Sequence, residues 1–125
     1  MTDSLREKLV YVCTNVADLY LSESETDSYP YVVYDMISTP LQTKDGVAGY
    51  TGDTKIRIVG QDLDNLDTIR SSIETAISTG MHDTSFGYNL RDVTKECTDG
   101  IWTIEMNYVL RQYADWTQPQ EQEND

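Results

Sequence analysis

The first clear pattern in the chain predicts a helix. Apolar residues recur at spacings of three and four near the start of the sequence, and this period is typical of an amphipathic helix. The stripe consists of Leu5, Leu9, Val12, Val16 and Leu19. Ser4 and Glu7 have the spacing of a capping box. Thr2 and Asp3 are the alternative caps, so the helix is expected to start near Asp3 or Ser4. The acidic, turn-forming run at 22–28 then predicts a surface connection.

The next pattern predicts a strand that is apolar on both faces. Tyr31, Val33 and Ile37 alternate with Val32, Tyr34 and Met36. The first helix can cover only one face of this strand. The other face is therefore expected to meet another helix, a folded-over hairpin or a neighbouring subunit, and this favours an oligomer. Pro30 fits the start of the strand, and Pro40 is expected to end it.

A polar stretch rich in glycine follows at 41–52, with the sequence LQTKDGVAGYTG. Asp45 and Gly46 form a turn signal, because the favoured hairpin turns need positive φ angles. The stretch is interpreted as a hairpin arm with Tyr50 on its return leg. Two roles remain open for the arm, a contact with a partner and an ordinary mobile connection.

The second half of the chain repeats these periods. Ile56 and Ile58 are expected inside a strand at 55–59. A second helical stripe ends at Gly80, in a C-cap position. Its apolar residues are Leu66, Ile69, Ile73 and Ile77. A strand at 86–97 changes phase before Val93, which indicates a bulge.

A turn at 98–100 then leads into a strand with one buried face. That face consists of Trp102, Ile104, Met106, Tyr108 and Leu110. The predicted fold is therefore α+β, with two helices packed on an antiparallel or mixed sheet of about four to five strands. The expected order is helix, strand, hairpin arm, strand, helix, strand, strand. Residues 1–113 are expected to form a single domain, followed by an acidic polar tail at 114–125.

Charge limits the functions that the chain can have. The 125 residues include 22 acidic and 9 basic side chains, for a formal net charge of −13. Because nucleic-acid binding needs cations that displace phosphate counterions, this charge argues against ordinary DNA or RNA binding. Nine tyrosines suit half-buried sheets or protein interfaces. The sequence has no apolar run of 18 residues, so no membrane span is expected.

No residue pattern predicts catalysis or a cofactor. His82 is the single histidine, and Asp83 and Ser85 beside it in sequence do not make a triad. Cys13 and Cys97 are too few for a disulfide framework or a zinc cluster. The acidic run at 62–67 lacks the glycine and glutamate of a calcium-binding EF-hand loop. The chain is expected to be a non-enzyme without metal or cofactor.

The order of elements resembles the tail-terminator, or tail-completion, family of long-tailed bacteriophages, whose members are also described as minor capsid or head–tail joining proteins. The resemblance covers about residues 4–113 and rests on short strand and helix patterns. These are the run Tyr29-Pro30-Tyr31-Val32-Val33-Tyr34, the run Gly49-Tyr50-Thr51, the run Ile56-Arg57-Ile58, the second helical stripe and the Tyr108 strand.

The resemblance implies a virion protein that forms a ring, typically a hexamer, assembled in the host cytoplasm. Such a ring caps the tail tube, joins it to the head connector and surrounds a channel that DNA passes through without specific binding. The acidic charge suits such a channel. The acidic tail has no role implied by the family.

For the subunit or partner contacts, the candidates lie on the first strand, on the arm and in the tail. They are Tyr34, Met36, Lys44, Asp45, Val47, Tyr50 and Trp116. Trp116 has two readings, since it either packs on its own domain or binds a partner. Two other functions remain open: a small acidic protein that imitates DNA and inhibits a nucleic-acid enzyme, and an unrelated α+β adaptor domain.

Overall fold

The computed structural model describes residues 1–14, 16, 19–21 and 29–118. The expected α+β class is confirmed, with two helices and one sheet. The elements in chain order are α1 (Leu5–Cys13), β1 (Leu19–Leu21), β2 (Tyr31–Thr43), β3 (Gly46–Gly60), α2 (Leu63–Gly80), β4 (Phe86–Thr98) and β5 (Ile101–Gln112).

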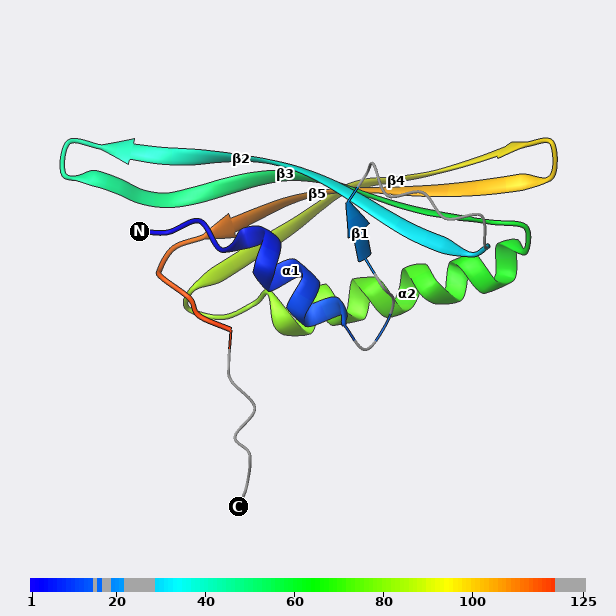
Figure 1. Ribbon diagram of the computed structural model, residues 1–125, viewed down its shortest axis with the longest axis horizontal. Coiled ribbons are helices and arrows are strands. Elements are labelled where there is room, and N and C mark those ends of the chain that lie inside the picture. Colours follow the sequence, from blue (N-terminus) through cyan, green and yellow to red (C-terminus); the bar gives the residue numbers. More distant parts are fainter. Residues whose placement is uncertain (15, 17–18, 22–28, 119–125) are drawn as a thin grey trace, which may run out of the picture.

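The strands form one mixed sheet with the order β1-β2-β3-β5-β4. The β2–β3, β3–β5 and β5–β4 pairs are antiparallel, and only the short β1 runs parallel to its neighbour β2. Both helices lie on the same side of the sheet (Figure 1). The β2–β3 and β4–β5 hairpins extend toward opposite ends of the molecule (Figure 1).

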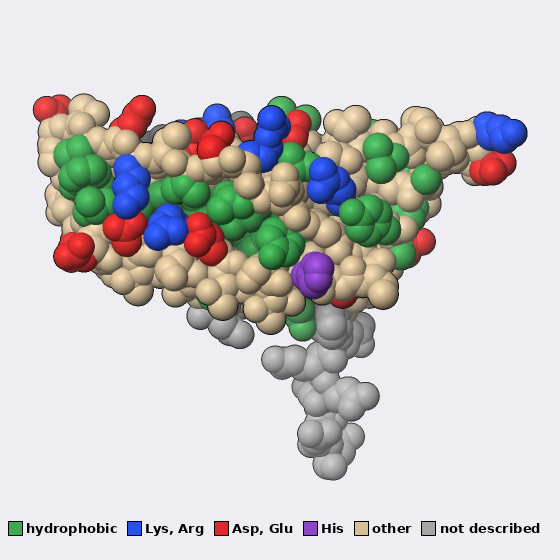
Figure 2. All heavy atoms as spheres, turned by 180° about the vertical axis from the view of Figure 1, so that it is seen from behind, with side chains coloured by type: hydrophobic (Ala, Val, Ile, Leu, Met, Phe, Trp, Pro, Cys, Tyr) green, Lys and Arg blue, Asp and Glu red, His purple; other side chains and the backbone are tan. Residues whose placement is uncertain are grey.

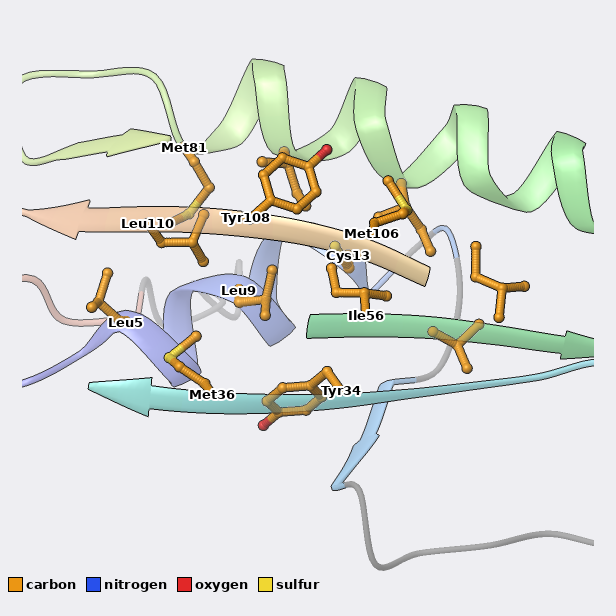
Figure 3. Packing of buried hydrophobic residues seen from close by; sticks show 14 of the residues in the cluster. Leu5, Leu9, Cys13, Tyr34, Met36, Ile56, Met81, Met106, Tyr108 and Leu110 are labelled. Carbon is orange, nitrogen blue, oxygen red and sulfur yellow. The ribbon is translucent and has the colours of Figure 1, made fainter. Parts of the chain in front are cut away.

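The hydrophobic core lies between the helices and one face of the sheet. Leu5 and Leu9 of α1 are fully buried, as are Ile73 and Ile77 of α2. They pack against the alternate side chains of the strands, among them Met36 of β2 (Figure 3). The predicted inward faces of two strands are confirmed for six residues that are fully buried or nearly so: Ile56, Ile58, Ile104, Met106, Tyr108 and Leu110. Trp102, predicted on the same face, is only partly buried at the margin of the core.

Turn chemistry also follows the sequence. Asp99 and Gly100 connect β4 to β5 with φ angles of 54° and 79°, the positive values that the tightest hairpin turns require. The pairing of β4 with β5 shifts register between Leu90 and Asp92. The phase change expected before Val93 is therefore a β-bulge, as predicted.

The first helix is shorter than its apolar stripe predicted. It ends at Cys13, and Leu19 lies in β1, paired beside Val32 at the edge of the sheet. Helical periodicity alone did not reveal this, because a free sheet edge can hold an apolar segment in extended form. The acidic run at 22–28 lies outside the described residues.

The predicted capping box is wrong, although Ser4 is the N-cap residue. Its backbone N–H donates to Gln112 Oε1 at 2.8 Å, and its hydroxyl donates to the Trp116 carbonyl at 3.1 Å. The Asp3 carboxylate accepts from the Leu5 N–H instead, at 3.1 Å. The start of α1 is therefore fixed by long-range contacts with the C-terminal part of the chain as well as by a local cap.

The glycine-rich stretch is a continuous hairpin. Pro40 does not end the strand, because β2 runs on to Thr43 and pairs with β3 to the turn. β1 reaches only as far as Tyr34, so Pro40 lies on a free edge where a missing N–H is tolerated. The turn at Asp45 and Gly46 is confirmed, with Gly46 at φ 116°.

Candidate assembly surfaces

The side chains of Tyr34 and Met36 are buried within their own subunit. Their side chains are 4% and 7% exposed and belong to the core cluster with Leu5 and Leu9 of α1. Figure 3 shows Met36 on β2 directed toward α1. Burial raises the pKa of the Tyr34 hydroxyl, and the Arg6 guanidinium carbon 5.9 Å from the ring centroid opposes that shift. The prediction that these two residues form an exposed interface is wrong, because α1 covers this face of β2.

The opposite face of β2 is open around Ile37 in the part of the chain that the structure describes. Among the described residues no helix covers this face, which carries the odd-numbered side chains of the strand. Val33 is buried, but Ile37 is 68% exposed and is the most exposed large apolar side chain of the described chain. The alternation along β2 predicted that Ile37 lies on the opposite face of the strand from Tyr34 and Met36. Only the position of the helices shows which of the two faces is open.

The outer face of the sheet carries charges of both signs. A shallow hollow of about 200 Å³ there is lined by Asp35, Ile37, Asp53, Lys55, Arg91 and Asn107, with parts of Thr54 and Tyr108. Beside it, Glu105 lies 3.9 Å from Lys55 Nζ and 3.7 Å from Arg57 Nε. This face therefore does not present a uniform row of carboxylates.

The outer half of the β2–β3 hairpin, residues 41–49, is called the arm below. Beyond Tyr50 the β3 strand pairs only with β2, because its pairing with β5 ends there. Lys44 and Asp45 are exposed at the tip, which projects from the body in Figure 2. Leu41 is 44% exposed, and Val47 is half-buried. These residues lie together on the arm, as the sequence predicted.

Tyr50 lies at the base of the arm and contacts its own subunit. Its hydroxyl donates to the Met1 carbonyl at 2.8 Å, and its ring packs against the core. Tyr50 therefore anchors the N-terminal residues and is not a projecting contact residue.

Trp116 also packs on its own subunit, which was the first of its two readings. Its ring centroid lies 5.6 Å from that of Tyr11 and 6.0 Å from that of Phe86. Lys8 Nζ lies 4.9 Å from the Trp116 ring centroid. In addition, Asp115 Oδ1 accepts from the Thr2 N–H at 2.9 Å. The packed part of the described chain therefore continues beyond residue 113.

A groove on the outside of α1 was not predicted. It has a volume of about 360 Å³ and is lined by Arg6, Glu7, Val10, Tyr11, Thr14, Tyr34 and Gln118. Val10 and Tyr11 are both exposed. They lie outside the apolar stripe that faces the core, so the sequence marked them only as surface positions of an amphipathic helix.

The sheet has two free edges. β4 is the last strand on one side, and β2 beyond Tyr34 has no further strand beside it on the other, among the residues that the structure describes. β2 and β4 run in opposite directions, since three antiparallel pairings separate them. Both edges carry features that limit non-specific pairing, namely Pro40 on β2 and the bulge on β4.

The polar side chains do not form a recognisable chemical site. The His82 and Tyr88 rings are in edge contact, with 6.3 Å between their centroids. In the described ranges, no three His, Cys, Asp or Glu side chains are grouped so that they could hold a metal ion. No described helix is long and apolar enough to cross a membrane.

Asp67 of α2 belongs to an ion-pair network that ties α2 to β4. Its Oδ1 lies 2.9 Å from Lys95 Nζ and 3.4 Å from Arg70 Nε. Hydrogen bonding from Lys95, followed by the Lys95 and Arg70 charges, lowers the pKa of Asp67. These contacts hold the second hairpin on the helix, which is a structural role.

Comparison with known proteins gives a likeness of fold. No family model and no curated protein sequence matches the chain. Among solved structures, the fold is similar to that of a chain in the virion of a native gene transfer agent particle, with a TM-score of 0.54. The match covers 90% of this chain and 87% of the other at 13% sequence identity. At that identity the likeness establishes a shared fold.

Proposed function

We propose that this chain is a structural subunit of a phage-like virion, and more specifically a tail-terminator or tail-completion protein. The fold similarity to a chain of a gene transfer agent virion supports the broader role. The order of elements and the motifs of the sequence support the narrower one. No catalytic role is part of the proposal.

The single observation that best supports assembly into a ring is the pair of free edges on one sheet. β2 and β4 run in opposite directions at the two sides of the sheet. A rotation about an axis along the strands would therefore bring β4 of one copy beside β2 of the next and continue the antiparallel order. Such a head-to-tail contact closes into a ring when the rotation per subunit is right. The family resemblance favours six subunits.

The partners follow from the same resemblance. One face of the ring would meet the tail tube protein and the other the head connector, so the protein would be found in the tail or neck of the virion. The net charge of −13 would keep DNA from adhering to a channel through the ring. The outer face of the sheet carries charges of both signs. An acidic channel wall would therefore come from another surface or from the acidic tail.

The test is the state of assembly of the purified chain. Light scattering coupled to size-exclusion chromatography is expected to give the mass of a hexamer, and negative-stain electron microscopy is expected to show rings with a central opening. Addition of tail tubes should place these rings at tube ends. A protein that stays monomeric over a wide concentration range and does not bind tube ends would refute the proposal.

The DNA-mimic reading has one observation in its favour, which is the net charge. Against it, basic residues are interspersed among the acids on the sheet, and Lys55, Arg57, Arg70 and Lys95 all form ion pairs. A mimic would be a monomer or dimer that inhibits a DNA-binding enzyme. The same light-scattering measurement therefore separates the two functions.

A further inference from the structure

The arm carries charges that none of the described residues of its own subunit neutralise. Lys44 and Asp45 occupy its tip, and neither forms an ion pair within the described part of the chain. Leu41 is exposed further back on the same arm, where it pairs with Gly49. An exposed apolar side chain with charges of opposite sign near the tip can supply the apolar centre and the charged rim of a small contact.

The groove on α1 has the complementary set. Arg6 and Glu7 line it and likewise lack ion pairs with other described residues. Val10 and Tyr11 supply exposed apolar surface in the same groove. Although the chain has 22 acidic and only 9 basic side chains, Arg6 forms an ion pair with none of the acidic side chains that the structure describes.

Geometry excludes the arm of the same subunit as the occupant. Tyr34, which lines the groove, and Lys44 at the tip are ten positions apart along a single extended strand and its turn. At about 3.3 Å per residue this is a separation on the order of 30 Å. The paired hairpin cannot fold back over that distance without losing its ladder, so only the arm of another copy can reach the groove.

We propose that the arm of one subunit docks into the α1 groove of a neighbouring copy, with Lys44 beside Glu7, Asp45 beside Arg6, and Leu41 against Val10 and Tyr11. The contact is heterologous, since the arm and the groove are different surfaces of the same chain. This inference rests on the proposed ring and adds a second contact to the pairing of the sheet edges.

Charge reversal tests the pairing. Glu7→Lys and Lys44→Glu should each weaken assembly on the order of tenfold, because like charges then face each other, and the double variant should recover most of the loss. Asp64→Lys, an equal change of charge on exposed α2, serves as the matched control and should leave assembly unchanged. Circular dichroism checks that every variant is folded, and light scattering over a concentration series measures assembly.

Cross-linking tests the contact itself. In a background with Cys97→Ser, which removes the exposed thiol, one protein carries Leu41→Cys and another carries Val10→Cys. Mixed and treated with a short bismaleimide, they should form a covalent dimer of the two different chains. Leu41→Cys mixed with Ser72→Cys, on the exposed side of α2, is the control and should not be linked.

The outcomes separate this inference from the proposed function. If the wild-type chain forms rings but the single reversals have no effect and the Leu41–Val10 pair is not linked, the arm–groove contact is wrong while the ring stands. If the wild-type chain forms no ring and no linked species, both are wrong. Linking together with rescue by the double variant would establish the contact.

Discussion

The ammonium group of Lys8 lies among three aromatic rings. Its Nζ is 4.9 Å from the ring centroid of Trp116, 5.2 Å from that of Phe86 and 5.9 Å from that of Tyr11. Asp83 Oδ2 lies 3.8 Å away. Lysine is rarely buried without such partners, and the faces of aromatic rings attract a cation. The cluster links α1, β4 and the segment after β5.

Replacement of Trp116 tests this cluster. Trp116→Ala is expected to lower the free energy of unfolding by about 2 kcal/mol, since it removes a partly buried ring and one face of the Lys8 environment. Trp116→Phe should recover most of the loss. Urea denaturation provides the measurement. An unchanged midpoint for Trp116→Ala would show that the segment after β5 contributes nothing to stability.

Three buried groups that can lose a proton at high pH, a thiol and two tyrosine hydroxyls, make the free energy of unfolding sensitive to high pH. Burial raises the pKa of the Cys13 thiol from 9.0 to about 12, and burial raises the pKa of the Tyr108 and Tyr34 hydroxyls. Each group stays protonated in the native state at a pH where the unfolded chain has lost the proton. The stabilisation is therefore complete below about pH 9 and decreases as the pH rises toward about 12.

This predicts a loss of stability between pH 9 and pH 11 in urea titrations. Tyr108→Phe should make the loss shallower, because one of the three titrations is removed. Tyr29→Phe removes an exposed hydroxyl instead of a buried one, so it should leave the slope in this range unchanged and serves as the control. Equal stability at pH 8 and pH 11 in the wild-type chain would contradict the prediction.

At the scale of elements, α1 and α2 meet where Gly80 is the last residue of α2. A Cβ atom on Gly80 would overlap the Val12 side chain of α1. The pattern of the sequence marked Gly80 as the end of the second helix, but its second role depends on the neighbouring helix. A close approach of two helices is one reason for a glycine at such a position.

Gly80→Ala separates the two roles. Helix propensity alone would favour alanine by about 1 kcal/mol, whereas overlap with Val12 should make the variant less stable than the wild type by about 1–3 kcal/mol. The double variant Gly80→Ala with Val12→Ala should then be more stable than the sum of the single changes predicts. Thermal unfolding measures all three. A more stable Gly80→Ala variant would refute the close approach.

At the scale of the whole molecule, the placement of both helices on one side of the sheet divides β2 into a structural and an exposed face. Met36 belongs to the first face and Ile37 to the second. The two residues are neighbours in sequence and both apolar. Their expected behaviour on substitution is nevertheless opposite, and that contrast tests the architecture.

Met36→Lys should unfold the chain or cost more than about 3 kcal/mol, because it places an unpaired charge in the core. Ile37→Lys should leave the free energy of unfolding within about 0.5 kcal/mol of the wild-type value, since the new charge lies on the outer face opposite Asp53. If Ile37 lies in a subunit contact, the same variant should also shift the equilibrium toward monomers. Urea titration and light scattering distinguish these effects, and a strongly destabilised Ile37→Lys variant would contradict an open outer face.

The local elements of this protein were predictable because they depend on neighbouring residues. The stripe of Leu66, Ile73 and Ile77 specified α2, and alternation specified β5. Turn chemistry located both hairpin turns, since Gly46 and Gly100 have the positive φ angles that glycine permits. Together these signals gave the α+β class and the order of the main elements.

The sequence by itself therefore determined the helix and strand periodicities, the turns, and which side chains of each strand share a face. Only the tertiary structure decided which face of β2 is buried, where α1 ends and what Trp116 contacts, because these depend on residues far apart in sequence. The interface assigned to Tyr34 and Met36 was wrong for this reason, while the exposed Ile37 lay one position away. Apolar residues on both faces of a strand indicate that both faces can be covered. The packing of the helices decides which of the two faces is covered within the subunit.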